Sequence, residues 1–154
     1  MDCKIRKGRQ VDIPALYRLI KELAVYEKAG HEVSVTEKEL LEDGFGNRPL
    51  FEFFVAETGD AIRGIALYYY KYSTWKGKAL YLEDIVVDQQ YRRSGIGSQL
   101  FLAVKSEAQK NKVRRMEWQV LEWNDSAIAF YKKHQAELDE EWINCKFREE
   151  ALRG

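Results

Sequence analysis

The stretch of sequence that decides the fold is LYLEDIVVDQQYRRSGIGS, residues 80–98. Its apolar and β-branched start predicts a strand over residues 80–87. A short polar loop follows, and the glycine segment SGIGS, residues 94–98, then opens a helix. A helix start directs several free backbone N–H groups at one point, with the positive end of the helix dipole behind them. Glycines let an anion approach closely, so the segment predicts a cradle for phosphate oxygens. Arg92 and Arg93 add positive charge to it.

Two familiar nucleotide-binding patterns do not account for this cradle. The sequence lacks the Gly-Lys-Ser/Thr ending of a Walker A motif, and it lacks the three glycines of a Rossmann fingerprint in its N-terminal part. A Gly-x-Gly helix start alone also fits an ordinary turn. The preceding strand and the two arginines are what favour a phosphate site.

Hydrophobic periodicity on both sides of this stretch predicts a mixed α/β sheet. Antiparallel strands come first and alternating units follow, which is typical of a three-layer arrangement. Asp12 is expected to cap the first helix, and Thr36 with Glu39 forms a capping box for the second. The expected strands are residues 3–7, 51–57, 62–72, 80–87, 116–121 and 142–147, and the expected helices are residues 13–26, 36–44, 95–108 and 125–133.

Length and composition predict one domain over residues 1–154. With 45% hydrophobic residues the chain can bury a full core, which excludes a disordered or low-complexity protein. The 25 basic and 25 acidic residues cancel, so neither nucleic acid nor an anionic membrane is an expected partner. Cys3 and Cys145 have no metal-ligand spacing, and the N-terminus shows no apolar signal segment. We therefore expect a cytoplasmic protein without a metal.

Three polar features are candidates for chemistry. Strict alternation along a strand places Glu83 and Asp84 on opposite faces, so at least one carboxylate is expected to be buried, either in a salt bridge or in a site. Asn124 precedes a helix and is either its cap or a ligand-binding amide. Tyr131 in the same helix is either an aromatic at the edge of the core or a proton donor.

Joined together, these motifs resemble the GNAT acetyltransferase superfamily. The match lies in Glu83 to Val87, in Arg92-x-x-Gly95-x-Gly97, and in the pairs Trp123-Asn124 and Phe130-Tyr131. More of the chain resembles the spermidine/spermine (diamine) N-acetyltransferase family, through the segments RLIKELA (18–24), YE (26–27), TEK (36–38), LLEDGFG (40–46), YLED (81–84) and GIGS (95–98). Ser73-Thr74 is similar to the branch of that family that acetylates thialysine, because polyamine-preferring members tend to carry an acidic residue at the first of these positions.

The resemblance implies the GNAT fold, with six to seven strands, helices on both faces, and parallel strands that splay apart at an acetyl-CoA site. It implies Tyr131 as the general acid, and Glu83 is the expected base. The residues implied in acetyl-CoA binding are Ile85, Val86, Val87, Arg92, Arg93, Ser94, Gly95, Ile96, Gly97, Ser98, Asn124, Ala127 and Tyr131. Those implied in binding the amine are Tyr26, Glu27, Glu83, Asp84, Glu140 and Trp142.

The resulting hypothesis is an N-acetyltransferase that moves an acetyl group from acetyl-CoA directly to a primary amine. Carboxylates and aromatic faces favour a small cationic acceptor, a polyamine, a diamine or a thialysine-like amino acid. The resemblance also implies a homodimer. Two alternatives stay open: acetylation of a protein N-terminus or lysine side chain, and an acyl-CoA-binding regulatory module without turnover.

Overall fold

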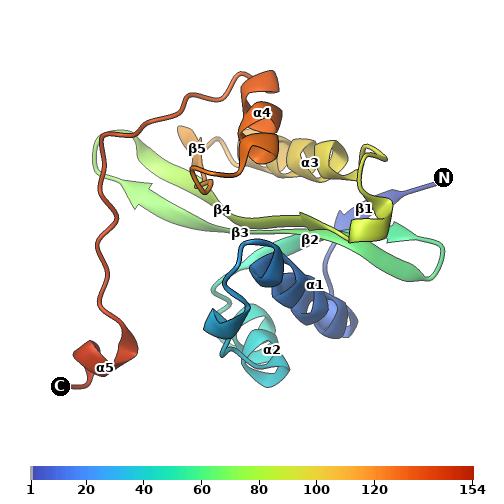
Figure 1. The fold of residues 1–154 in the computed structure, drawn as a ribbon, viewed down its shortest axis with the longest axis horizontal. Helices are drawn as coiled ribbons and strands as arrows, with labels where there is room; N and C mark the ends of the chain where they lie inside the picture. Colours follow the sequence, from blue (N-terminus) through green and yellow to red (C-terminus); the bar gives the residue numbers. More distant parts are fainter. Residues whose placement is uncertain (1) are drawn as a thin grey trace. The chain divides into compact units, whose positions relative to one another are not determined.

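The computed structural model describes residues 2–154, which form two compact units divided after Gln119 (Figure 1). The first unit contains one sheet with three helices. Its strands are β1 Lys4–Lys7, β2 Glu52–Thr58, β3 Ala61–Ser73, β4 Gly77–Val87 and β5 Arg115–Glu117, and its helices are α1 Ile13–Tyr26, α2 Glu37–Phe45 and α3 Ile96–Lys110. Three short 3-10 turns, η1 Gln10–Asp12, η2 Gly30–Glu32 and η3 Gln89–Tyr91, complete it.

The five strands of the sheet lie in the order β1-β2-β3-β4-β5. Neighbouring strands are antiparallel from β1 to β4, whereas β4 and β5 are parallel. This confirms the mixed α/β class. The strand count is five among the described residues rather than the expected six to seven, because residues 142–147 form no strand. The strand expected over residues 116–121 is present as β5, but residues 118–121 do not extend it.

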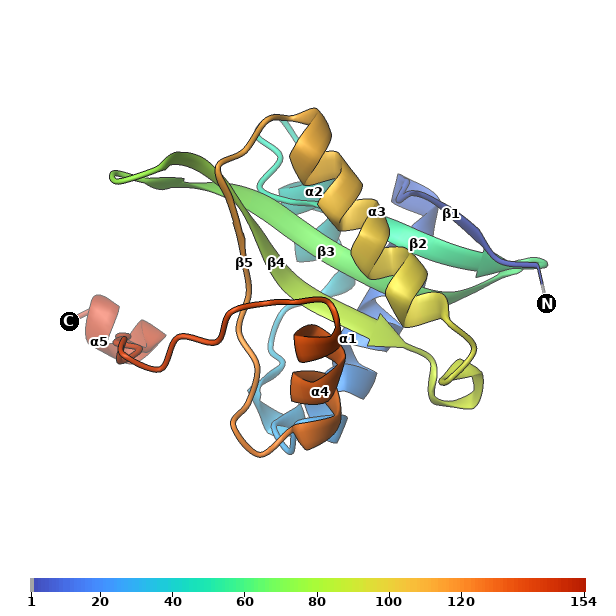
Figure 2. The same ribbon diagram turned by 90° about the horizontal axis from the view of Figure 1, so that it is seen from above.

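The sheet of the first unit separates its helices into two layers. Helices α1 and α2 cover one face and α3 crosses the other (Figures 1 and 2). On the α1 face, Leu16, Leu19, Val55 and Ile65 are fully buried in one apolar cluster. On the α3 face the helix packs very closely, since a Cβ at Gly64 would lie 3.0 Å from Leu100 Cδ1. Burial on both faces holds β3 and β4 rigidly at the centre.

Both ends of α1 are fixed by specific contacts. Asp12 is at the expected N-cap position, but its side chain does not cap the helix, because its carboxylate accepts from Arg6 over 2.8 and 3.0 Å. At the other end Lys28 has a left-handed φ of 62°, and the Ala29 N–H donates to the Ala24 carbonyl over 2.8 Å. This Schellman-type ending fixes the direction of the last α1 residues. The expected Thr36 cap of α2 is confirmed, because Thr36 accepts from the Glu39 N–H over 3.1 Å.

The second unit, residues 120–154, is mostly irregular. It contains α4 Asp125–Lys133, at the bounds the sequence predicts, and the short α5 Glu149–Leu152. The final predicted strand carries apolar side chains that are almost fully exposed, with Ile143 at 88% and Phe147 at 77%. No helix of residues 2–154 is long and apolar enough to cross a membrane.

Candidate acetyl-transfer site

A β-bulge in β4 determines where the candidate carboxylates lie. Leu67 of β3 pairs with Asp84, but the next residue, Tyr68, pairs with Leu82, so Glu83 is the extra residue of the bulge. Cross-strand partners share a face of the sheet. Asp84 therefore lies on the α1 face with Leu67. Glu83 lies on the same face, since the hydroxyl of Tyr69, whose pairing partner is Tyr81, donates to it.

The expected alternation of Glu83 and Asp84 is thus wrong, for a physical reason. A bulge inserts one residue and redirects the side chains that follow it, and bulges are frequent next to active sites. The outcome is two carboxylates on one face of the sheet.

Glu27, directly after the last residue of α1, supplies a third carboxylate. Glu27, Glu83 and Asp84 together form a carboxylate cluster. Burial, together with the negative charges of Glu83 and Glu27, raises the pKa of Asp84 to about 7. Burial also raises the pKa of Glu27. None of the ion pairs among residues 2–154 involves Glu27, Glu83 or Asp84, so the salt bridge that the sequence left open as an alternative is not formed there. The cluster therefore presents negative charge that a cationic ligand would stabilise.

Tyr69 is a member of this cluster that the sequence did not reveal. Its hydroxyl donates to Glu83 Oε1 over 3.0 Å, and its ring lies 5.4 Å from that of Tyr81. Burial and the hydrogen bond to Glu83 raise the pKa of Tyr69, so the phenol remains a donor. Tyr69 also lines a cavity of about 800 Å³ beside α2, whose lining includes Phe45, Phe51 and Phe53 as well as Lys7 and Glu52. In the sequence, only the aromatic run Tyr68-Tyr69-Tyr70 could have indicated this role of Tyr69. Strand propensity already explained that run.

One edge of β4 is open next to the carboxylates. The parallel pairing with β5 extends from Ala79–Arg115 to Tyr81–Glu117 and ends there, whereas β4 continues to Val87. Within the described part of the chain this edge carries no further strand, because β5 ends at Glu117. The backbone of Ile85, Val86 and Val87 can pair there with an extended amide-containing ligand.

The glycine segment forms the expected helix start directly after β4. Gly95 precedes α3 with a left-handed φ of 86°, and Arg93 also has a left-handed φ, of 65°. The Gly95 carbonyl accepts from the Gln99 N–H over 3.1 Å, so the N–H groups before Gln99 belong to the open first turn. Arg92, Arg93 and Ser94 flank this turn. A diphosphate fits such a turn through its backbone amides and the positive helix end.

Arg92 also connects the glycine segment to α1. Its Nε donates to the Val87 carbonyl over 3.3 Å, and its guanidinium lies 4.9 Å from the ring centre of Tyr26. Tyr26 is the last residue of α1 and Glu27 follows it. The structure therefore brings together, within the first unit, the candidate amine residues Tyr26, Glu27, Glu83 and Asp84 and the start of the candidate acetyl-CoA loop.

The remaining candidates belong to the second unit. Asn124 caps α4, because its side chain accepts from the Ala127 N–H over 3.2 Å. Tyr131 lies in α4, is only 7% exposed and packs edge-to-face against Phe130. Glu140 and Trp142 lie in the irregular segment after α4 and are exposed.

Ser73, the residue on which the similarity to the thialysine-acetylating branch was based, stabilises a turn in this chain. It ends β3, is buried, and its hydroxyl accepts from the N–H groups of Trp75 and Lys76 over 3.3 and 3.1 Å. The side chain thus stabilises the turn between β3 and β4 and adds no charge.

Comparison with known proteins agrees with the fold and with the motifs of the sequence. The model of the Acetyltransferase (GNAT) family matches residues 13–135. The chain is 38% identical to thialysine N-epsilon-acetyltransferase of Mus musculus, over 97% of this chain and 95% of the relative. It is 36% identical to spermidine/spermine N(1)-acetyltransferase-like protein 1 of Homo sapiens, over 97% of this chain but 23% of that longer protein. A solved aminoglycoside N-acetyltransferase in complex with CoA has the same fold, with a TM-score of 0.77, 20% identity, and coverage of 96% of this chain and 95% of that one.

The chain therefore belongs to the GNAT acetyltransferase family. The resemblance inferred from the motifs, including the similarity to the thialysine-acetylating branch, is confirmed by these matches. The protein is an enzyme of the acyl-transfer class.

Proposed function

We propose that this protein transfers an acetyl group from acetyl-CoA to a primary amine of a small cationic acceptor. The observation that carries the proposal is the cluster of Glu27, Glu83 and Asp84 beside the open edge of β4, without an ion pair to a lysine or arginine in residues 2–154. A second ammonium group on the acceptor is the charge that this cluster lacks. The aromatic face of Tyr26 adds a further contact for a cation.

The chemistry requires a base for the acceptor. A primary amine with a pKa near ~10.4 arrives mainly as an ammonium and must lose a proton before it can attack the thioester. Glu83, exposed and oriented by Tyr69, is proposed as this base, directly or through a water molecule. Asp84 and Glu27 are proposed to hold the second charge of the acceptor.

Acetyl-CoA is proposed to bind along the start of α3 and the open edge of β4. Its diphosphate would contact the backbone of residues 93–98 with Arg92 and Arg93, and its pantetheine arm would pair with Ile85 to Val87. The Asp88 N–H donates to the Arg63 carbonyl, so the Val86 N–H, two residues earlier, also faces β3. The N–H of a neighbour of Val86, Ile85 or Val87, faces the open edge and is proposed to stabilise the developing oxyanion. Asn124 and Ala127 are proposed to complete the site, and Tyr131 to protonate the leaving thiolate, on their match to the family motifs. Alignment of the two reactants can supply roughly 7–11 kcal/mol of the rate enhancement.

Among small amines, thialysine-like amino acids are the first proposed acceptors and polyamines the second. The names of the near full-length relatives support this order, as does Ser73, which adds no negative charge. Glu140 and Trp142 are proposed to contribute charge and an aromatic face to the acceptor site. Direct transfer is proposed because neither Cys3 nor Cys145 lies in the motifs.

We further propose that residues 1–154 act as one domain and assemble as a homodimer in the cytoplasm. The family match spans residues of both compact units, which supports one functional domain. The exposed apolar side chains of Trp142, Ile143 and Phe147 support association with a second copy. Cys3 and Cys145 are free thiols, which is typical of a reducing compartment. Neither nucleic acid nor a membrane is a proposed partner, because the net charge is zero.

The test is thiol release from acetyl-CoA by the purified protein with thialysine, lysine, spermidine, spermine, putrescine, a lysine-containing peptide and no acceptor. We expect acceptor-dependent release that is strongest with one class of small amine. Release with the peptide alone would favour a protein acceptor. Binding of acetyl-CoA with no release above the blank would favour a module without turnover, and either result would overturn the proposal.

A further inference from the structure

One stripe of α1 contacts the loop that precedes the glycine segment at three successive points. Arg18, Glu22 and Tyr26 follow each other at four-residue spacing and therefore share one side of the helix. Arg18 reaches Asp88, Glu22 accepts from the Gln89 N–H over 3.0 Å, and Tyr26 lies under Arg92. The contacts occur in the same order along the helix and along the loop.

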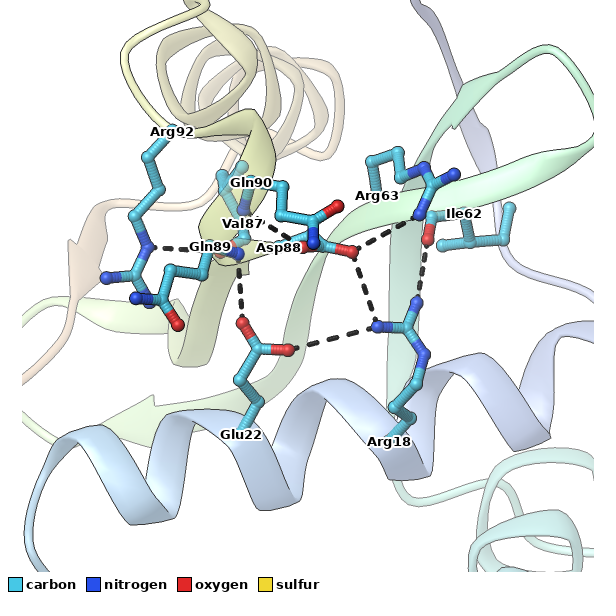
Figure 3. Close-up of polar contacts among 9 residues, drawn as sticks. All are labelled: Arg18, Glu22, Ile62, Arg63, Val87, Asp88, Gln89, Gln90 and Arg92. Atoms are coloured by element: carbon cyan, nitrogen blue, oxygen red, sulfur yellow. Dashed lines mark hydrogen bonds and ion pairs between the residues drawn. The ribbon is translucent and has the colours of Figure 1, made fainter.

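Asp88 is the centre of this arrangement (Figure 3). It is buried, at 8% exposure, and its Oδ2 is approached by Arg18 over 3.5 Å and by Arg63 over 3.4 Å. Its other oxygen accepts from the Gln90 N–H over 3.1 Å, and its own N–H donates to the Arg63 carbonyl over 2.7 Å. Without this carboxylate, two guanidinium groups would face one another in a partly buried position.

Arg63 extends the network to the end of η3. Its guanidinium lies 4.4 Å from the ring centre of Tyr91, the last residue of that turn. The Tyr91 carbonyl in turn accepts from the Ser94 hydroxyl, inside the glycine segment. A continuous chain of contacts thus leads from α1 and β3 to the residues that would receive the diphosphate. We call Arg18, Glu22, Arg63, Asp88 and Gln89 the Asp88 network.

The glycine segment needs such support because its backbone is unusual. Arg93 is held in the left-handed region, at φ 65°, where a residue with a Cβ is strained. A loop that is free to relax would have to be ordered again whenever a ligand binds, and that ordering costs binding free energy. A loop already fixed on rigid elements avoids most of this cost.

We propose that the Asp88 network is a positioning device that sets the affinity for acetyl-CoA, by fixing the loop of residues 88–95 to α1 and β3. The inference rests on the proposed function only in taking acetyl-CoA as the ligand of this loop. None of the five residues is proposed to touch a reacting atom.

Two variants of Glu22 give the sharpest test. Glu22→Gln retains an oxygen that can accept from the Gln89 N–H, whereas Glu22→Ala removes it. Asp88→Asn removes the charge shared by the two arginines. Asp12→Asn is the matched control, because Asp12 is a similarly buried carboxylate paired with an arginine, but it lies at the other end of α1.

The Kd of acetyl-CoA is measured by calorimetry without an acceptor, beside the Tm and the amide exchange of residues 93–98 in the ligand-free protein. For Glu22→Ala and Asp88→Asn we expect a Kd raised by roughly 2- to 30-fold, the range in which residues outside a binding site modulate affinity, with faster exchange. Glu22→Gln should bind nearly as tightly as the wild type. Asp12→Asn should lower the Tm and leave the Kd unchanged.

A network that only stabilises the fold would give a different result. Glu22→Ala and Asp88→Asn would then lower the Tm as Asp12→Asn does, with the wild-type Kd and exchange, and the inference would be overturned. If Asp88→Asn does not fold, the pair of Glu22 variants carries the test. Because binding is measured without an acceptor, failure of the proposed amine chemistry is seen separately, as wild-type binding without thiol release.

Discussion

The Tyr69 hydroxyl donates to Glu83 Oε1 over 3.0 Å, across a bulge that places Glu83 on the same face of the sheet as Asp84. This bond gives the exposed Glu83 side chain a fixed orientation, which an exposed carboxylate on a regular strand would lack. The contact of the Tyr69 ring with the tilted ring of Tyr81 holds the donor in place. The relationship joins the fold to the proposed chemistry, since a base must be aligned with the proton it accepts.

Replacement of Tyr69 by phenylalanine tests this alignment. We expect Tyr69→Phe to lower kcat by roughly 10- to 150-fold, since a hydrogen bond to a charged group contributes ~1.5–3 kcal/mol, and to leave the Kd of acetyl-CoA unchanged. Tyr70→Phe is the control, because Tyr70 pairs with Leu80 and contacts Tyr68 on the other face. Equal kcat values for both variants in the thiol-release assay would show that Tyr69 has no part in the reaction.

Asp84 makes the stability of the protein depend on pH. Its pKa is about 7 in the folded protein and ~3.9 in an unfolded chain, so the folded state binds more protons between these values. The free energy of unfolding therefore decreases as the pH rises from about 4 to about 7. We expect Asp84→Asn to raise the stability by roughly 2–4 kcal/mol at pH 8 and to change it little near pH 4.

Denaturant unfolding of both proteins at the two pH values measures this difference. A gain that is the same at pH 4 and pH 8 would contradict the assignment of the titrating group. The same variant should raise the KM for the amine, so Asp84 is expected to favour function at the expense of stability.

The carboxylate cluster predicts a preference for acceptors with a second positive charge. We expect kcat/KM for the best acceptor of the panel to exceed, by roughly tenfold or more, that of an analogue of the same length without the second amino group. This corresponds to the ~1.5–3 kcal/mol of a hydrogen bond to a charged group. The difference should shrink in Asp84→Asn. An analogue that reacts as well as the diamine would mean that the cluster does not bind the acceptor.

Gly95 tests the backbone requirement of the proposed diphosphate site. Its φ of 86° is costly for alanine, so Gly95→Ala should lose about 1 kcal/mol of stability and also weaken acetyl-CoA binding. Gly59→Ala is the matched control, since Gly59 has a φ of 62° and, like Gly95, open space around it, but lies in the turn between β2 and β3. Both variants should lose similar stability in denaturant unfolding. Equal acetyl-CoA binding by both would contradict the role of the glycine segment.

The sequence predicts local features of this protein well. Helix α4 begins and ends at the predicted residues because Asn124 supplies its cap and the apolar spacing is helical. Thr36 caps α2 for the same kind of reason. The glycine segment opens α3 as expected, since a turn of this type depends on glycine itself.

Features that depend on distant residues could not be predicted. The bulge at Glu83 follows from the register between β3 and β4, which the alternation within one strand does not reveal. Asp12 binds Arg6 of β1 instead of capping α1, because a buried charged partner competes with the cap. Residues 142–147 have the composition of a strand but form none, since a strand needs a partner for its backbone and a surface for its apolar side chains.

The Asp88 network belongs to the same class of features. Its four-residue stripe on α1 is visible in the sequence, but the loop that the stripe contacts is far away along the chain.

The most direct test of the central claim is kcat of Glu83→Gln with the best amine at saturating acetyl-CoA, beside the Kd of acetyl-CoA for the same variant. Glutamine retains the shape and the bond to Tyr69 but cannot accept the proton. We expect kcat to decrease by roughly 10²- to 10⁴-fold with an unchanged Kd, as for the loss of a general base. A kcat close to that of the wild type, with acetyl-CoA still bound normally, would contradict the role of Glu83 and of the carboxylate cluster built around it.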